Sequence, residues 1–169
     1  MSDLPWFQLV TAAALGNLPG IAVRQSAASV ASLFGGRQPI YLATPYSRDC
    51  TDVLGAWSRE ESDRMERRAA MAAAELLAVG VTALSPIVQA VRMVNATGIY
   101  RHHRAGVAFE PTIDPLDAAM WVRWCQPLLN VCGAMVVPDI PGWDQSAGVW
   151  GEVQFAVARQ IPVFIYGGP

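Results

Sequence analysis

Short apolar runs alternate with amphipathic stretches along most of the chain. Four runs of four or five mostly apolar residues are bounded by turn residues, which is typical of strands buried in a parallel sheet. Other stretches repeat apolar residues at helical spacing. The predicted strands are residues 39–43, 81–84, 134–137 and 162–166, and the predicted helices include residues 116–131, despite Pro127, and residues 147–159.

A further helix lies between the first two strands. Ser58 and Glu61 have the spacing of a capping box, in which the hydroxyl and the carboxylate each satisfy a free backbone N–H. Gly80 ends the helix. The apolar positions between them recur every three or four residues: Met65, Ala69, Ala72, Leu76 and Val79.

Strands that alternate with helices form βαβ units, with parallel strands and right-handed crossovers. We therefore expect a three-layer α/β sandwich of the flavodoxin or Rossmann type, with a parallel sheet of four to five strands. Residues 39–169 should form this domain, although residues 87–115 show no clear pattern.

The first 38 residues precede this pattern. Residues 4–23 carry no charge, which is also seen in membrane spans and secretory signals. Polar and turn residues interrupt the stretch, however, so we expect an apolar helix over about residues 4–15 that packs on the domain or on a partner. Residues 16–38 are expected to be a connector with a short helix at residues 27–34.

Composition narrows the function classes. The chain has 169 residues, of which 53% are hydrophobic and 15% charged, with a net charge of −2. The mean hydropathy is +0.27 and the pI is about 5.6. Because a nucleic-acid groove normally carries a basic stripe, we expect no nucleic-acid partner. Because the chain is so apolar, we expect it to bury part of its apolar surface in a homo-oligomer. We expect no membrane partner.

Three cysteines lack the spacing of a metal site. Cys50, Cys125 and Cys132 form no CxxC pair and leave an odd number. They therefore indicate reduced thiols in the cytoplasm, with neither a disulfide framework nor a zinc site. The sequence predicts no cofactor and no metal.

Three loops should border a ligand site, because open parallel sheets bind ligands beyond the carboxyl ends of their strands. These loops are residues 43–50, 84–86 and 138–148. In the third, Ser146 stands where a helix N-cap would, so the free N–H groups that follow it favour an anion. Glu152 lies six residues further on, where it should face either the strand-end cleft or solvent.

Several short motifs occur in a distinctive order. They are IYLATPYS at residues 40–47, SP at 85–86, GWDQSxGVxxE at 142–152 and PVFIY at 162–166. In this order the chain resembles the nucleoside 2-deoxyribosyltransferase-like superfamily, and in particular an uncharacterised bacterial and phage branch, over about residues 39–166.

The resemblance implies an N-glycosidic reaction on a nucleotide or nucleoside. Glu152 would attack the anomeric carbon and expel the base, and water or a second base would resolve the glycosyl-enzyme. Tyr41 would hydrogen-bond to Glu152 and orient it, although a buried strand aromatic is the alternative. Relatives that hydrolyse nucleotide 5′-monophosphates tend to have a serine where Ser146 stands, whereas transferases acting on free nucleosides tend to have an acid.

Further residues are candidates for substrate binding. Thr44, Tyr46 and Ser47 would complete the phosphate cradle together with Gly148 of the helix entry. Trp143 would stack on a base or cap the loop. Asp144 would bind substrate hydroxyls or stabilise the turn, and Asp139 directly follows a strand.

One departure from the family leaves the activity open. The family usually has an aspartate near the position of Cys125, where it handles the leaving base, and often another at Gly133. A replacement acid would have to come from Glu110, Asp114 or Asp117, and His102 with His103 would be base-contacting groups or a polar loop. The alternatives are therefore a non-catalytic nucleotide-binding module or an assembly protein that uses the N-terminal helix.

Overall fold

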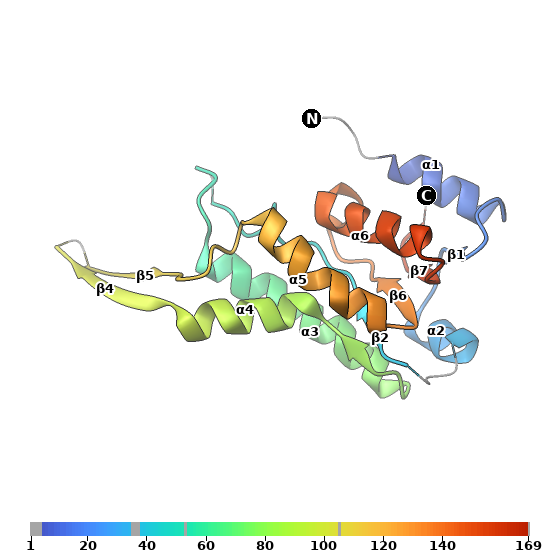
Figure 1. The fold of residues 1–169 in the computed structure, drawn as a ribbon, viewed down its shortest axis with the longest axis horizontal. Helices are drawn as coiled ribbons and strands as arrows, with labels where there is room; N and C mark the ends of the chain where they lie inside the picture. The colour runs from blue at the N-terminus through green and yellow to red at the C-terminus, as the bar shows by residue number, and fades with distance from the viewer. Residues whose placement is uncertain (1–4, 35–37, 53, 105, 169) are drawn as a thin grey trace.

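The computed structural model describes residues 5–34, 38–52, 54–104 and 106–168. A parallel sheet of five strands lies between two layers of helices, so the predicted three-layer α/β fold is confirmed (Figure 1). The strand order is β1-β7-β6-β2-β3. The strands are β1 (Ile21–Ala22), β2 (Ile40–Leu42), β3 (Ala83–Leu84), β6 (Ala134–Val137) and β7 (Val163–Ile165).

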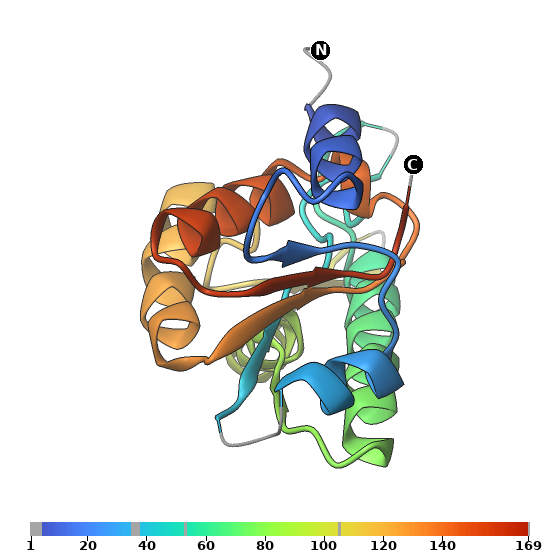
Figure 2. The ribbon, with the colours of Figure 1, turned by 90° about the vertical axis from the view of Figure 1, so that its right-hand side faces the viewer.

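Side chains alternate between the two faces of this sheet. Tyr41, Met135 and Val163 point to the core that includes the helices α1 (Trp6–Ala14), α5 (Ala118–Val131) and α6 (Ala147–Ala158). Their strand neighbours point to the core that includes α2 (Ala27–Phe34) and α3 (Arg59–Ala78). Figure 2 shows the sheet between these two groups of helices. Because successive residues of a strand face opposite sides, this alternation directs Tyr41 toward α5 and α6.

The N-terminal segment is part of the same sheet. Trp6 is 3% exposed and makes edge contacts with Trp143 and Trp150, with ring centroids 4.8 and 4.9 Å apart. The expected connector contains β1, which pairs with β7, and α2 forms where the short helix was predicted. The sequence pattern missed β1 because two residues are too few to show a period.

The helix α3 is capped differently from the expected capping box. Ser58 Oγ accepts from the Glu61 N–H at 3.4 Å, as predicted. The Ser58 N–H instead donates to the Cys50 carbonyl, and the Glu61 carboxylate pairs with Arg64 at 2.8 Å. The loop that follows β2 therefore satisfies the donor that the carboxylate was expected to satisfy.

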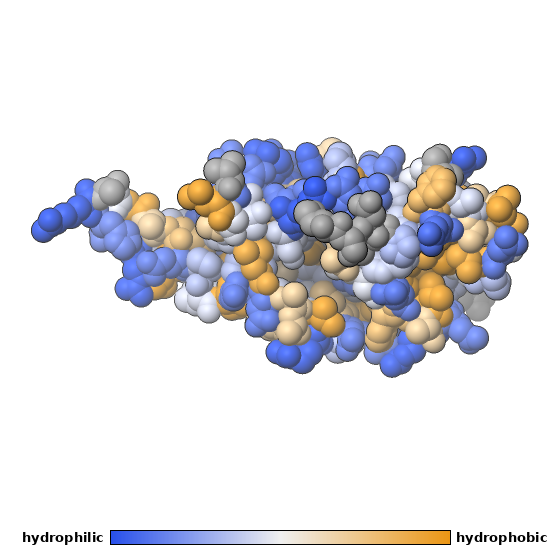
Figure 3. All heavy atoms as spheres, turned by 90° about the horizontal axis from the view of Figure 1, so that it is seen from above, coloured by the Kyte–Doolittle hydropathy of each residue, from blue (hydrophilic) through white to orange (hydrophobic). Residues whose placement is uncertain are grey.

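Residues 87–115 form a helix and a projecting hairpin. The helix α4 (Pro86–Thr97) packs on α3 and is followed by an antiparallel pair, β4 (Ile99–His103) and β5 (Gly106–Glu110). This hairpin extends away from the domain (Figure 1). Its far end is hydrophilic and apolar side chains lie closer to the domain (Figure 3). Most of its side chains are exposed. Among the described residues, no helix is both long enough and apolar enough to cross a bilayer.

Candidate functional site

A cavity of about 600 Å³ borders the carboxyl end of β2. The chain leaves β2 toward α3 on one face of the sheet, and leaves the adjacent β6 toward α6 on the other face. Such a reversal is the place where open α/β sheets bind ligands. The cavity has a polar wall and an apolar wall. The polar wall comes from Tyr41, from Thr44 and residues 46–48 after β2, and from residues 145–149, 151 and 152 at the start of α6. The apolar wall comes from α4 and α5, and Phe155 of α6 also lines the cavity.

Tyr41 and Glu152 meet in this cavity. Tyr41 is fully buried on β2, and its hydroxyl donates a hydrogen bond to Glu152 Oε1. On α6, Val149 and Val153 point into the core between helix and sheet, and Glu152 lies beside them on the same helix. The sheet alternation and the register of α6 thus bring together two groups 111 positions apart in sequence.

Burial changes the acidity of both groups. It raises the pKa of Glu152 from an ordinary 4.5 to about 7, although the hydrogen bond from Tyr41 acts in the opposite direction. Burial, and next the nearby charge of Glu152, raise the pKa of Tyr41 far above its ordinary range. The phenol therefore remains a hydrogen-bond donor, and the carboxyl group changes charge near neutral pH.

Cys125 approaches the same pair from α5. Burial, followed by the charge of Glu152, raises the pKa of the Cys125 thiol to about 11, while a hydrogen bond with Tyr41 acts to lower it. The thiol is therefore neutral at physiological pH and a weak acid.

The entry to α6 has the features of an anion site. Ser146 caps the helix and its Oγ accepts from the Val149 N–H at 3.3 Å. The first N–H groups of a helix have no intrahelical acceptor, and the helix dipole favours negative charge there. Arg48 lies on the same wall and donates to Gln145 Oε1.

Thr44 adds an unsatisfied group to this wall. It is only 6% exposed, lines the cavity, and its Oγ1 has no hydrogen-bond partner among the described residues. This oxygen is itself buried, so it is an unsatisfied polar atom inside the wall and does not face the cavity as an exposed contact for a ligand.

The other predicted residues of the polar wall differ in whether they can still bind a ligand. Ser47 and Gly148 are exposed and line the cavity. Tyr46 also lines it, but its hydroxyl already lies 2.8 Å from Ser62 Oγ and accepts from Trp57 Nε1 at 3.1 Å. Tyr46 therefore anchors its loop to α3 and has little hydrogen-bonding capacity left for a ligand.

Three predicted substrate-binding residues do not line the cavity. Trp143 is 8% exposed and packs edge-on against Trp6, so it belongs to the core and not to the site. Asp139 and Asp144 are exposed elsewhere on the loop after β6. The expected stacking role of Trp143 fails because the N-terminal helix covers its ring.

The structure also places the candidate replacement acids. Asp117 caps α5 by accepting from the Met120 N–H, and Asp114 accepts from the Leu116 N–H. Glu110 pairs with Arg101 on the hairpin, which also carries His102 and His103.

The cavity is lined by none of these candidate acids and histidines, namely Glu110, Asp114, Asp117, His102 and His103. A Cβ atom at Gly133 would lie too close to the side chains of Gln38 and Phe34, which would have to move. Gly133 precedes β6 and thus lies at the amino ends of the strands, opposite the carboxyl ends that border the cavity.

The apolar wall was not identified from the sequence. It comprises one face of α4, with Ile87, Ala90 and Val94, and a stripe of α5 with Trp121, Val122, Trp124, Cys125 and Leu129. Spacings of three and four residues put this stripe on one side of α5, but ordinary core helices have the same pattern. Only the unusual density of tryptophan could have indicated a ligand surface.

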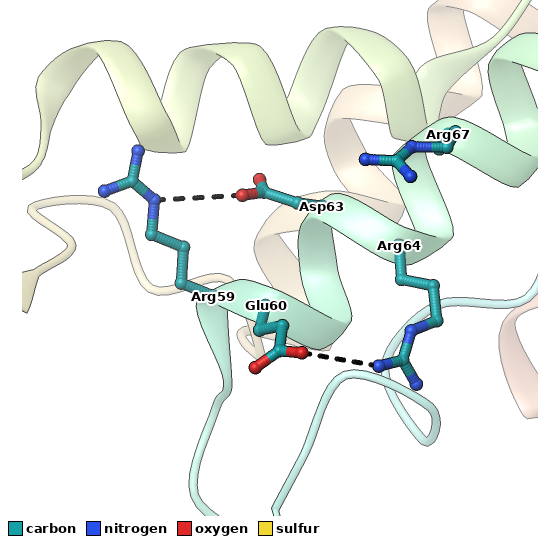
Figure 4. Close-up of a pocket in the computed structure, with 5 residues that line it drawn as sticks. All are labelled: Arg59, Glu60, Asp63, Arg64 and Arg67. Carbon is teal, nitrogen blue, oxygen red and sulfur yellow. Dashed lines mark ion pairs between the residues drawn. The ribbon is translucent and has the colours of Figure 1, made fainter.

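A second hollow of about 630 Å³ lies on the outer side of α3. It is lined by charged side chains that pair along the helix (Figure 4), including Arg64 with Glu60 at 3.6 Å and Arg59 with Asp63 at 4.0 Å. Such pairs are typical of a solvated helix face. Among the described residues no group of three or more potential ligands could hold a metal ion.

Fold and cavity together define an open α/β protein with a carboxyl–phenol pair at the switch point of its sheet. The chain belongs to the family described as "Domain of unknown function (DUF1937)", whose model matches residues 38–168. Searches of curated proteins and of solved structures found no match.

Proposed function

We propose that this protein breaks N-glycosidic bonds in nucleotide 5′-monophosphates or nucleosides, as a hydrolase or a deoxyribosyltransferase with Glu152 as nucleophile. The observation that carries the proposal is the hydrogen bond from Tyr41 to Glu152 in a cavity bordered by a helix N-terminus. The resemblance of residues 39–166 to nucleoside 2-deoxyribosyltransferase-like proteins supports it.

The chemistry needs an anion beside the anomeric carbon. Glu152 would attack C1′ while the bond to the base breaks, and the positive charge that develops on the sugar would be stabilised by the carboxylate. Tyr41 holds one carboxylate oxygen, so the other is free to attack. With a pKa near 7, Glu152 is mostly ionised above neutral pH.

The polar wall favours a phosphorylated substrate. Ser146, the free N–H groups at the start of α6, and Arg48 all suit a phosphate. A volume of about 600 Å³ lies within the range of small-molecule sites. Water would then resolve the glycosyl-enzyme, or a second base would do so in a transferase.

The proposal is tested by free-base release. The protein is incubated with a panel of ribo- and deoxyribonucleotide monophosphates and the matching nucleosides, and released base is separated and quantified. Glu152→Gln should abolish release, whereas Glu60→Gln on the exposed face of α3 should leave it unchanged. If no substrate is consumed faster by the native protein than by Glu152→Gln, the enzymatic proposal is wrong.

A second candidate function is a nucleotide-binding module without catalysis. It is favoured because, among the described residues, Glu152 is the one carboxylic acid that lines the cavity. Thermal-shift measurements separate the two proposals, because a binding module would be stabilised by a nucleotide that it does not consume. Absence of any nucleotide binding would contradict both.

We also propose a homo-oligomer in a reducing compartment such as the cytoplasm. The three cysteines are free thiols, and free thiols are typical of proteins in a reducing compartment. The hairpin packs on Trp57 and Arg59 at its base but leaves Ile99, Tyr100 and Val107 exposed, and these apolar side chains are a surface that a second copy could cover. The alternative assembly through α1 is less favoured, since Trp6, Val10 and Ala13 already pack inside the domain. Light scattering of the native protein and of a variant lacking residues 99–110 tests the role of the hairpin.

A further inference from the structure

The cavity lacks an obvious acid to protonate a departing base. Five of its described lining residues have titratable side chains: Tyr41, Tyr46, Arg48, Cys125 and Glu152. In the proposed function Glu152 is the nucleophile. Tyr41 already donates to Glu152, and the Tyr46 hydroxyl is engaged by Ser62 and Trp57.

The remaining two groups are also unsuited to this task. Arg48 is a guanidinium that stays protonated. Cys125 is a neutral thiol whose pKa burial raises to about 11. A general acid that is positioned to protonate the leaving group increases the reaction rate by about 10²–10⁴-fold. The described residues that line the cavity include no such acid.

An ordinary base needs this proton because it would otherwise leave as an anion. A base that already carries a positive charge does not need it. When its glycosidic bond breaks, the bonding electron pair returns to the ring nitrogen, cancels the charge, and releases a neutral molecule. The missing acid therefore slows the reaction of substrates with a neutral base, but not of substrates whose base carries a positive charge.

The apolar wall suits a flat cation. Trp121 and Trp124 both line the cavity, and their rings meet edge to face with centroids 5.7 Å apart. Aromatic faces attract cations, most strongly when water is excluded. No Asp, Glu, Lys or Arg among the described cavity residues comes from α4 or α5. The negative charge of Glu152 would add a favourable interaction from the opposite wall.

We propose that the preferred substrates are N-glycosides of cationic bases, of which N-substituted pyridinium nucleotides are the simplest. This proposal rests on the N-glycosidic function proposed above and specifies its substrate class. Glu152 attacks C1′, the C1′–N⁺ bond breaks, and the neutral base leaves. Water then attacks C1′, the glycosyl–Glu152 ester bond breaks, and one proton passes to solvent.

The experiment compares two nucleotides matched in sugar, phosphate and ring size. The cationic member is nicotinamide mononucleotide and the neutral member is uridine 5′-monophosphate, each with ribose and with 2′-deoxyribose. Each enzymatic rate is divided by the rate of uncatalysed hydrolysis under the same conditions, because pyridinium glycosides are intrinsically more labile. We expect the resulting rate enhancement to be at least about 100-fold larger for the cationic member.

The outcomes separate this proposal from the function on which it rests. If the neutral nucleotide shows an equal or larger enhancement that depends on Glu152, the substrate class is wrong and the N-glycosidic function stands. If Glu152→Gln changes neither rate, both proposals are lost.

A substitution at Cys125 tests the cause. Cys125→Asp supplies an acid beside the leaving base and should raise turnover of the neutral nucleotide at least about tenfold relative to the cationic one. Cys125→Ser is the control of similar size and should not change this ratio. Equal acceleration of both substrates by Cys125→Asp would contradict the proposal. Should Cys125→Asp fail to fold, the comparison of substrates on the native protein still decides.

Discussion

The two walls of the cavity are built in different ways. The polar wall is fixed by backbone features: sheet alternation orients Tyr41, and the capped start of α6 positions Ser146 and Glu152. The apolar wall is formed by side chains on one side of α4 and α5. Under the proposed function, the polar wall would carry out the reaction and bind the phosphate, and the apolar wall would receive the base.

The polar wall also has an energetic cost that the apolar wall lacks. A carboxyl group whose pKa is raised by burial is less stable in its charged form than it would be in water. A protein gains no stability from such a group, so its presence favours a functional role. Variants of each wall can therefore test the comparison.

The largest effect is expected for Glu152→Gln. We expect turnover to fall by at least about 10³-fold, because the proposed nucleophile is lost. The same change should stabilise the fold at pH 8 by up to about 3 kcal/mol. In the native protein, the folded state binds a proton more tightly than the unfolded state, so stability declines as pH rises from about 4.5 to about 7.

The pH dependence provides the control for this prediction. Glutamine does not titrate, so the stabilising effect should be largest above pH 7 and should disappear well below pH 4.5, where Glu152 is protonated in both the folded and the unfolded state. Urea unfolding at several pH values measures this difference. If Glu152→Gln were equally or less stable than the native protein at pH 8, burial would not raise the pKa of Glu152 in the folded protein.

A smaller effect is expected for Tyr41→Phe. This variant keeps the buried ring but removes the hydrogen bond, so we expect kcat/KM to fall by about 10–100-fold. Because the hydrogen bond lowers the pKa of Glu152, its loss should shift the rising limb of the pH–rate profile to higher pH. Tyr166→Phe is the matched control, since the hydroxyl of Tyr166 has no hydrogen-bond partner among the described residues and does not line the cavity. An unshifted profile would exclude Tyr41 as a positioning residue.

Much of the sheet and of the polar wall could be predicted from sequence. The strand runs around Tyr41 and Met135 are short, apolar and bounded by turns, and such local signals survive in the fold. Ser146 was recognised as a helix cap because capping depends only on neighbouring residues. The meeting of Tyr41 and Glu152 was not predictable from these two elements and was expected only from the resemblance to the nucleoside 2-deoxyribosyltransferase-like superfamily.

The features that sequence could not reveal depend on contacts between distant segments. Trp143 was expected at the site, but it contacts Trp6, which lies 137 positions earlier. The strand β1 is recognisable only through its pairing with β7. The wall from α4 and α5 has the periodicity of an ordinary core helix, so nothing local distinguishes a face that lines a cavity from one that packs against protein.

Ser146→Asp should change substrate preference with a moderate effect. Aspartate caps helices as well as serine does, so the fold should keep its stability. Its negative charge would repel a phosphate, and we expect kcat/KM for a nucleotide monophosphate to fall by about tenfold relative to the corresponding nucleoside. Ser58→Asp, which alters the cap of α3 in the same way, should leave the ratio unchanged. A ratio unaffected by Ser146→Asp would remove the phosphate from this end of the polar wall.

The smallest effect is expected on the apolar wall, for Trp121→Leu. Loss of the indole removes its edge contact with Trp124 and one aromatic surface for the base. Contacts of this kind contribute about 0.5–1.5 kcal/mol, so KM for a pyridinium nucleotide should rise by about 3–10-fold. If this wall only binds the base, as the proposed function implies, kcat should stay within about twofold of the native value.

The variant Trp121→Phe distinguishes the contribution of the aromatic ring from that of the indole hydrogen bond. The indole N–H donates to the Asp114 carbonyl at 3.0 Å, and phenylalanine removes this bond while retaining an aromatic face. Steady-state kinetics of both variants on nicotinamide mononucleotide should therefore give a KM for Trp121→Phe close to that of the native protein. If Trp121→Leu lowers kcat and leaves KM unchanged, the two walls do not divide chemistry from binding, and the contrast between them would have to be abandoned.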